Sequence, residues 1–340
     1  MNMRYYMFGM DNCRSAECAK DLRGRGIDTV VGVSGACAEA AAREGLRVIA
    51  CYGAFAGNAD SPMAESASGE KGVWFGSGCP CDEENARGRI DAAIRVAKDC
   101  GAEEVWADGA RFASPEPVHE NFFSCFCPEC MRRGAEAGFD MEKMRADVLA
   151  FGRTAETPVP AEWLRFRAWR IGEYFKSFAE QAHAAGLKAG SFVFADSLSR
   201  LVGQSAEAVS CLDTLAPMLY RRYAEPVGTA CLNSEYAALY TRFAARGDRD
   251  PAESIRLLTG VRMPADSAET IRGEGFGCAR IGIETAAARK SFAGTLAPIL
   301  QLDDDRLDES IRSARDAGAD AVGFFMWKRE FVPYLDMVRS

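Results

Sequence analysis

The sequence predicts an α/β fold, specifically a (β/α)8 TIM barrel with long loops after its strands. A series of short runs is apolar on both faces, as buried parallel strands are. Stretches with helical periodicity separate these runs. The segments that follow the runs are often long, which is typical of barrels that carry chemistry at one end. The predicted strands are 4–10, 29–33, 47–52, 104–108, 188–194, 214–220, 295–301 and 321–327.

The helix pattern is clearest over 160–185. Apolar side chains recur there at steps of three and four residues, from Leu164 to Ala182, and form one core-facing stripe. Gly186 ends this helix. A further helix is predicted over roughly 84–100. Residues 280–284 could form a competing strand, but Ala- and Arg-rich residues follow directly, which favours a helix.

The length of 340 residues suits one barrel domain with enlarged loops. We therefore expect residues 1–340 to form a single (β/α)8 domain with loop insertions around 56–80, 112–160 and 221–250. Loops at the carboxyl ends of barrel strands are where such folds keep their chemistry. The predicted functional face is therefore the rim at the strands' C-terminal ends.

Composition argues against several partners. The formal net charge is -8 and the pI is about 5.1, whereas nucleic-acid binding needs clustered Lys and Arg. No apolar run reaches the roughly 18 residues of a membrane helix, and the first residues lack the pattern of a signal peptide. Most of the thirteen cysteines are scattered singly, as reduced buried thiols are. We expect a cytoplasmic protein without a nucleic-acid or membrane partner.

Several familiar chemistries have no support. The two histidines, His119 and His183, exclude a three-His zinc site and argue against a Ser-His-Asp triad. Neither a phosphate-binding Walker loop nor a Rossmann glycine fingerprint is present. No cofactor is therefore expected for catalysis.

Asp108 is the first candidate for chemistry because it ends the fourth predicted strand, in Val105-Trp-Ala-Asp-Gly-Ala-Arg-Phe112. A carboxylate there projects into the rim, and Gly109 removes bulk beside it. Arg111 could pair with Asp108, as a loop-closing salt bridge or to hold it ionised, or could bind a substrate oxygen.

Other polar and aromatic residues follow the same placement rule and could each instead cap or pack. Together they provide carboxylates, a hydroxyl, an amide and indoles, which suits the hydroxyl edges and apolar faces of sugars. The expected substrate-binding residues are Asp11, Trp74, Arg111, Gln301 and Trp327, and the rim also holds Asp196, Tyr220 and Asp303.

Glycoside hydrolysis usually needs two carboxyl groups. Asp108 is the first, as acid or nucleophile, and Asp196 and Asp303 are the candidates for the second. Substrate-assisted hydrolysis would need one protein acid only, with Tyr220 orienting the substrate.

A cysteine cluster is the other distinct signal. Cys125, Cys127 and Cys130 lie within six residues, and Cys79 and Cys81 lie on the loop after strand three. Four thiolates from two adjacent loops would form a closed tetrahedral zinc site of the structural type. The alternative is a group of reduced thiols that only pack.

Four motifs carry a resemblance to a known family. They are, in order, Asp108-Gly-Ala-Arg-Phe112, Ser124-Cys-Phe-Cys-Pro-Glu-Cys130, Trp163-Leu-Arg-Phe-Arg167 and Ala216-Pro-Met-Leu-Tyr220. Together they resemble an uncharacterised family of bacterial (β/α)8-barrel proteins assigned to the glycoside hydrolases. Met218-Leu-Tyr220 and Trp327 are also similar to residues of chitinase-type barrels, although the acidic run on strand four of those enzymes is reduced here to Asp108.

The resemblance implies a glycoside hydrolase acting on an oligosaccharide or glycoside. One alternative is a barrel that binds a carbohydrate or metabolite without catalysis. Another is a sugar lyase or isomerase that uses a metal held by rim carboxylates.

Overall fold

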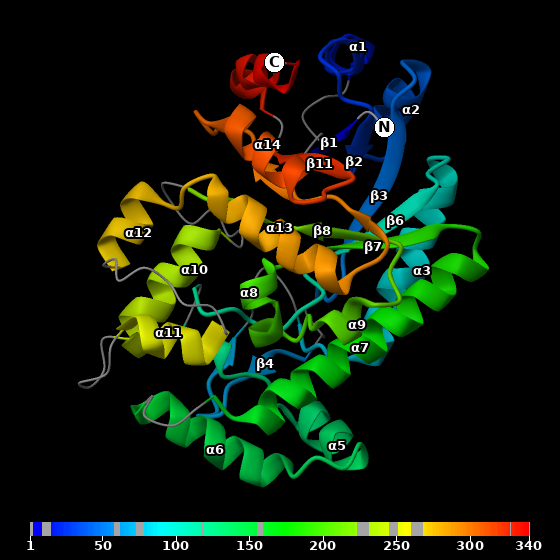
Figure 1. Cartoon of the computed structure of the whole chain (residues 1–340). Helices are drawn as coiled ribbons and strands as arrows, with labels where there is room; N and C mark the ends of the chain where they lie inside the picture. Colours follow the sequence, from blue (N-terminus) through cyan, green and yellow to red (C-terminus); the bar gives the residue numbers. More distant parts are fainter. Residues whose placement is uncertain are drawn as a thin grey trace.

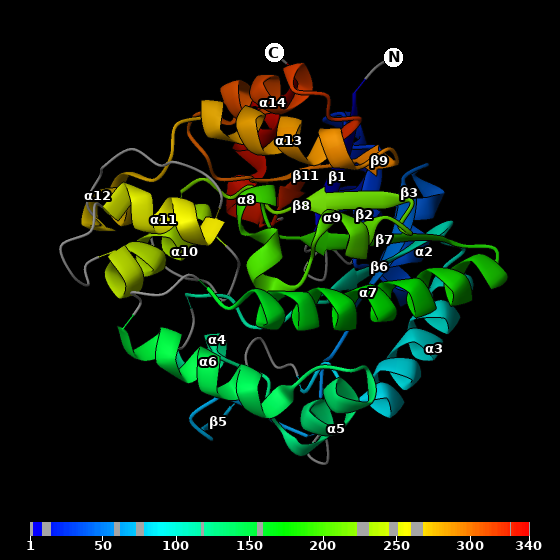
Figure 2. The same cartoon turned by 60° about the horizontal axis from the view of Figure 1, so that its bottom comes forward.

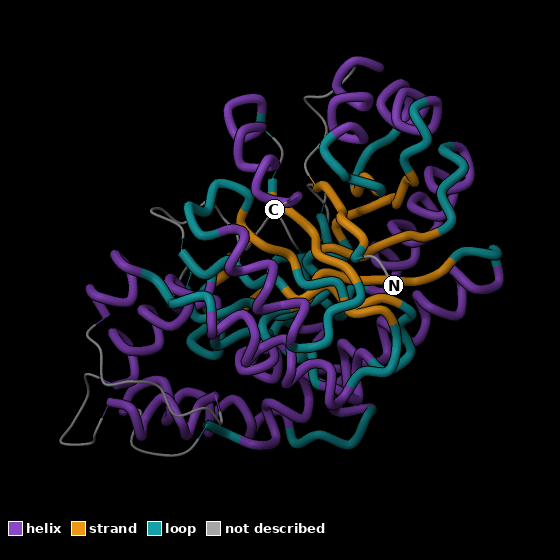
Figure 3. Tube along the Cα trace, turned by 45° about the horizontal axis from the view of Figure 1, so that its top comes forward, coloured by secondary structure: helices purple, strands orange, loops and turns teal. Residues whose placement is uncertain are grey.

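Parallel strands occupy the centre of the computed structural model, and helices surround them (Figures 1 and 3). The structure describes residues 3–8, 15–57, 62–72, 78–116, 119–154, 159–222, 231–244, 251–259, 268–326 and 328–339. The central strands are β1 (Arg4–Phe8), β2 (Thr29–Val31), β3 (Arg47–Gly53), β6 (Glu104–Asp108), β7 (Lys188–Val193), β8 (Thr214–Pro217), β9 (Thr295–Leu296), β10 (Ile299–Gln301) and β11 (Ala321–Phe325).

The segment 295–301 closes the sheet. Its first part, β9, pairs with β8, and its second part, β10, pairs with β11, which in turn pairs with β1. Ala297 donates a hydrogen bond to the Leu215 carbonyl at 2.9 Å, and the Pro298 carbonyl accepts one from Gly323 at 2.9 Å. The predicted single strand is divided because Pro298 has no N–H to donate. The eight predicted runs thus form a parallel barrel, and the predicted fold class is confirmed.

Side chains alternate between the barrel interior and the surrounding helix layer. On β6, Trp106 belongs to an interior cluster with Tyr6 and Phe192, whereas Val105 packs in the outer core. Because side chains on a strand alternate with a period of two, Asp108 lies on the same side as Trp106. The carboxylate therefore stands at the open end of the barrel interior.

The helices that cover the barrel largely follow the predicted pattern. The long helix predicted over 160–185 is present, and so are the one over 84–100 and the helical form of 280–284. The chain leaves the long helix through Gly186, whose φ of 80° is a left-handed conformation suited to glycine. The covering helices include α1 (Ala16–Gly24), α2 (Gly35–Arg43), α3 (Glu83–Asp99), α7 (Ala161–Ala184), α8 (Asp196–Ser199), α9 (Ala206–Val209), α13 (Ala279–Ser291) and α14 (Leu307–Asp316).

The long segments after the strands carry elements of their own. Figure 2 shows α5 and α6 on the far side of α7 from the sheet, while α10, α11 and α12 gather at one flank of the barrel. The elements after β3 are β4 (Ala64–Glu65) and β5 (Lys71–Gly72); those after β6 include α4 (His119–Phe122), α5 (Pro128–Glu136) and α6 (Met141–Thr154); and those after β8 include α10 (Leu232–Leu239), a π-helical turn (Tyr240–Ala244), α11 (Pro251–Thr259) and α12 (Ala268–Glu274).

Two expectations drawn from composition can be compared with the described residues. None of the helices described combines the length and the apolar character that crossing a membrane requires. Eleven of the described cysteines are outside any disulfide, as expected, whereas Cys18 is disulfide-bonded.

Candidate active site

Asp108 lies half-buried at the end of β6. Gly109 follows with a φ of 66°, so the chain turns immediately after the carboxylate at a residue that accepts this conformation. The Gly109 N–H donates a hydrogen bond to the carboxylate. Burial raises the pKa of Asp108 to about 6, and this effect outweighs the Arg111 charge and the hydrogen bond, which lower it.

Arg111 is buried, with 5% of its surface exposed. It forms no ion pair within 4.0 Å with Asp108 among the described residues, so it acts on the carboxylate through charge and not through a bridge. Its guanidinium lies 4.8 Å from the ring centroid of Phe194 and donates to the Phe112 carbonyl at 3.2 Å. Burial lowers the pKa of Arg111, and two carboxylates, Asp108 and Glu235, raise it.

Glu235 is a second perturbed carboxyl, and the sequence analysis missed it. It lies on α10 with 2% of its surface exposed, and it accepts hydrogen bonds from the Ser114 hydroxyl at 2.6 Å and the Glu116 N–H at 3.0 Å. Burial is the main cause that raises its pKa to about 7, against the Ser114 hydrogen bond and the Arg111 charge. The available signal was an acid within the otherwise largely uncharged segment Leu232–Leu239.

A buried polar network joins α10 to helices α8 and α13. The Tyr236 hydroxyl donates to the Ser197 hydroxyl at 2.7 Å and accepts from Arg280 at 2.8 Å. The Ser197 hydroxyl in turn donates to Glu284 at 2.6 Å, and Arg280 forms an ion pair with Glu284. This network fixes α10, the helix that carries Glu235.

Aromatic rings form the floor beneath the rim. Phe8 packs on Phe325 with ring centroids 5.3 Å apart and on Phe192 at 4.9 Å, and Tyr220 lies 5.2 Å from Phe325. Phe8 and Phe325 are partly exposed. Apolar rings below polar groups form the kind of surface on which sugar rings stack.

Two buried acceptor atoms at the rim lack a hydrogen bond within the part of the chain that the structure describes. The Gln301 side chain is 8% exposed, and its Oε1 is buried without a hydrogen bond among the described residues. Asp303 is half-buried and its Oδ1 is likewise buried without one. Because Ile299 belongs to the interior cluster and Leu300 and Leu302 to the outer core, alternation directs Gln301 to the interior side. Unsatisfied buried acceptors are costly, which favours a ligand with hydroxyl donors here.

Two of the predicted catalytic residues, Tyr220 and Asp196, lie on opposite sides of the barrel wall. Tyr220 lies in the barrel interior with 1% of its surface exposed, among the aromatic residues of the floor. Asp196 instead begins α8 and lines a cavity of about 20 Å³ with Val209 and Ala288, in the layer between the barrel wall and the helices. The structure therefore does not bring Asp196 to Asp108. Three predicted binding residues, Asp11, Trp74 and Trp327, lie outside the described residues.

Four of the five predicted cysteine ligands come together. The sulfur atoms of Cys79, Cys125, Cys127 and Cys130 all lie within 4.8 Å of one another, and all four residues are buried. The Cys79 sulfur lies 3.3 Å from those of Cys127 and Cys130 and 3.8 Å from that of Cys125. Thiolates 2.3 Å from a tetrahedral zinc ion lie about 3.8 Å apart, so the spacing fits. Cys81 lies beside the group, where its N–H donates to the Cys79 sulfur at 3.3 Å.

Arg167 is a buried cation beside this cluster. It is fully buried on α7 and its guanidinium lies 3.9 Å from the Trp163 ring centroid. Burial lowers the pKa of Arg167, and the neighbouring Cys125 acts in the opposite direction. A buried cation without a carboxylate partner among the described residues favours a negatively charged cysteine group, as four thiolates around one divalent ion are. The backbone carbonyls that accept from Arg167 are those of Ala113, Phe122, Ser124 and Leu201.

Comparisons with known proteins support the fold. No protein-family model and no curated protein matches the sequence. The catalytic domain of a β-amylase from Paenibacillus polymyxa superposes with a TM-score of 0.57 at 9% identity, covering 98% of this chain and 94% of that one. A GH18 chitinase from Pseudoalteromonas aurantia superposes with a TM-score of 0.41 at 9% identity, covering 99% of this chain and 98% of that one. A D-tagatose 3-epimerase-like protein superposes with a TM-score of 0.43 at 10% identity, covering 99% of this chain and 96% of that one. Likenesses this weak carry no information on function.

The fold and the rim thus define an α/β protein of the TIM-barrel class. At 9% identity the likeness extends to the fold alone. The resemblance to a glycoside-hydrolase family, drawn from the sequence motifs, stays a prediction.

Proposed function

We propose that this chain is a single-domain cytoplasmic glycoside hydrolase that acts on an oligosaccharide or glycoside at the C-terminal rim of its barrel. The observation that carries the proposal is Asp108, a half-buried carboxyl with a pKa of about 6 above an aromatic floor. A carboxyl that stays partly protonated near neutral pH can donate a proton to a glycosidic oxygen.

The rim residues have distinct roles in this proposal. Asp108 is the general acid, and Asp303 supplies the second carboxylate, since its buried Oδ1 has no partner among the described residues. Gln301 accepts hydrogen bonds from sugar hydroxyls, and the floor around Phe8 and Phe325 stacks on the sugar ring. Glu235 is a positioning residue: it accepts from the loop after β6 and faces the charge of Arg111.

A structural zinc ion at Cys79, Cys125, Cys127 and Cys130 is the second part of the proposal. The sulfur spacing, the burial of the thiols and the adjacent Arg167 charge support it. A closed four-thiolate site leaves no coordination position for substrate, so the ion would stabilise loops and take no part in the reaction.

The proposed activity is tested on a panel of 4-nitrophenyl glycosides and oligosaccharides. The wild-type chain is compared with Asp108→Asn and with Asp91→Asn, an exposed matched control on α3. We expect hydrolysis of at least one substrate and a loss of about 10² to 10⁴-fold in Asp108→Asn only, the usual contribution of a general acid. Equal turnover in the two variants would refute the role of Asp108, and saturable binding without turnover would favour the carbohydrate-binding alternative.

A further inference from the structure

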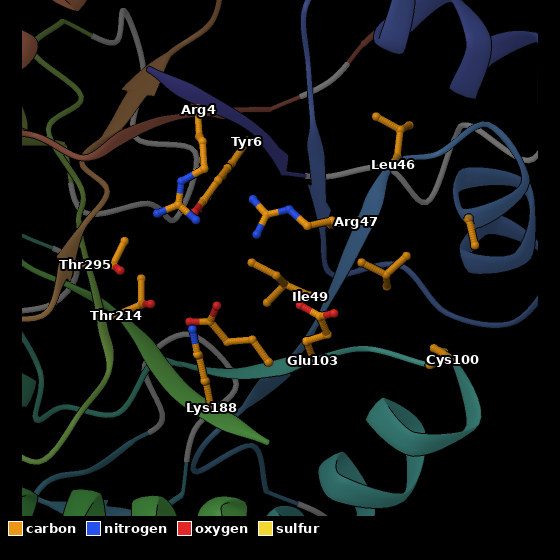
Figure 4. A pocket seen from close by; sticks show the side chains of 14 residues that line it. Arg4, Tyr6, Leu46, Arg47, Ile49, Cys100, Glu103, Lys188, Thr214 and Thr295 are labelled. Atoms are coloured by element: carbon orange, nitrogen blue, oxygen red, sulfur yellow. The ribbon is translucent and has the colours of Figure 1, made fainter. Parts of the chain in front are cut away.

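A second cavity lies at the opposite end of the barrel from Asp108. It has a volume of about 230 Å³ and is lined by the residues that begin the strands, among them Arg4, Arg47, Glu104 and Lys188. Figure 4 shows the charged ends of Arg4, Arg47 and Lys188 directed into the same space from three different strands. The cavity is therefore separate from the proposed active site.

The cations of this cavity are incompletely neutralised. Arg47 lies 3.1 Å from Asp28, outside the cavity lining. Arg4 and Lys188, in contrast, have no acidic partner within 4.0 Å among the described residues, although Arg4 lies 5.7 Å from the ring centroid of Tyr6. Glu103 and Glu104 also line the cavity, and neither forms an ion pair with Arg4 or Lys188 within 4.0 Å. These two cations are therefore available to an anionic group of a ligand.

The rest of the lining provides hydrogen-bond acceptors. Glu104 is held in place by the Trp106 indole, which donates to it at 2.8 Å, and Glu103 lies next to it in the chain. The hydroxyl-bearing side chains of Thr214 and Thr295 complete one wall (Figure 4). A ligand that carries only negative charge would be repelled by the two carboxylates. A ligand with an anionic group and several hydroxyl donors would satisfy both parts of the lining.

We propose that this cavity binds a small phosphorylated polyol. The phosphate binds Arg4, Arg47 and Lys188, and the hydroxyl groups donate to Glu103 and Glu104. The volume of about 230 Å³ lies below the roughly 300 Å³ at which pockets for drug-sized ligands begin, so the ligand is small. The site lies outside the proposed catalytic rim and does not depend on the proposed activity.

The test is isothermal titration of the full chain with glycerol 3-phosphate, inorganic phosphate and glycerol. We expect saturable binding of glycerol 3-phosphate, weaker binding of phosphate and none of glycerol. Lys188→Gln and Arg4→Gln are each expected to weaken both anions about tenfold or more, the effect of one charge-assisted hydrogen bond. The matched control is Lys176→Gln, an exposed lysine on α7 that does not line the cavity.

Glu103→Gln tests phosphate binding and hydroxyl recognition separately. Because a neutral amide removes a negative neighbour of the phosphate, this variant is expected to bind inorganic phosphate at least as well as wild type. Its preference for glycerol 3-phosphate over phosphate should shrink. Absence of saturable binding in wild type, or equal weakening in Lys176→Gln, would overturn the site. Asp108→Asn should bind normally, so failure here and failure of the proposed hydrolase activity are distinguishable.

Discussion

The Ser114 hydroxyl donates a hydrogen bond of 2.6 Å to the Glu235 carboxylate and so joins the loop after β6 to helix α10. The two residues are 121 positions apart in the chain. The charges of Glu235 and Asp108 both act on Arg111 and raise its pKa, against the lowering effect of burial. The electrostatics of the rim therefore depend on an insertion that belongs to a different strand of the barrel.

The first prediction concerns the pH dependence of activity. A general acid works in its protonated form, and the pKa of Asp108 is about 6. We expect kcat/KM to fall about tenfold per pH unit above about 6. The measurement is a pH profile on the best substrate of the glycoside panel. A profile that stays flat from pH 6 to 8 would contradict the assignment.

The second prediction separates Arg111 from Asp108. The Arg111 charge lowers the pKa of Asp108, so Arg111→Met should raise it further. The alkaline limb of the profile is then expected to move to higher pH, while kcat at low pH changes less. Arg312→Met, an exposed arginine on α14, is the control. A limb that stays in place in the Arg111 variant, with folding verified by circular dichroism, would exclude this electrostatic link.

The third prediction concerns stability and Glu235. Its folded-state pKa, about 7, lies above the ordinary value of 4.5, so the folded chain binds this proton more tightly than the unfolded chain. The stability that results is complete below pH 4.5 and is lost as the pH rises through about 7. The loss is on the order of 3 kcal/mol for a fully buried group. Glu235→Gln has no carboxyl to titrate here. As the pH rises from 4.5 to about 7, the Tm of this variant should therefore increase relative to that of wild type.

The control for Glu235 is Glu207→Gln, an exposed residue on α9. Its Tm should follow that of wild type at every pH. If the difference between Glu235→Gln and wild type is the same at pH 4.5 and pH 7.5, the carboxyl does not titrate as described.

The fourth prediction concerns metal content. Protein purified without chelator should contain one zinc ion per chain by elemental analysis, and Cys130→Ser should lose most of it together with thermal stability. Cys278→Ser replaces a buried cysteine outside the cluster and should keep the metal. Wild-type protein without bound metal would leave the thiols as packing residues.

The fifth prediction tests the counter-charge of the cysteine site. Arg167→Met removes both the charge and the carbonyl hydrogen bonds, whereas Arg167→Lys keeps the charge but offers fewer donors to the carbonyls. Both variants should lower the Tm, because buried carbonyls lose donors. Zinc affinity is expected to fall strongly in the Met variant and less in the Lys variant. Equal zinc affinity in all three proteins would show that Arg167 is structural only.

The barrel could be predicted because its signals are local. Strands β3 and β6 are apolar runs between helical stretches, and the helix 161–184 shows its stripe without reference to the rest of the chain. The position of Asp108 follows from the same reasoning, since a residue that ends a barrel strand lies at the rim. The cysteine group could be proposed because three of its members share one short segment.

Glu235, Arg167 and the placement of Asp196 could not be predicted in this way. Arg167 occupies a stripe position, four residues after Trp163, and a charge on a buried stripe was the signal available. The role of this buried charge depends on Cys125, which lies between α4 and α5, far from Arg167 in the chain. Asp196 follows β7 as expected, but the short helix it begins carries it outside the barrel wall.

The sequence by itself determined the eight strands and the position of Asp108 at the end of the fourth one, because hydrophobic periodicity is a property of neighbouring residues. Only the tertiary structure decided which charges meet there. Burial and Coulomb interactions depend on distances in space, and the loops that bring Glu235 to Arg111, or Arg167 to the cysteines, join segments far apart in the chain.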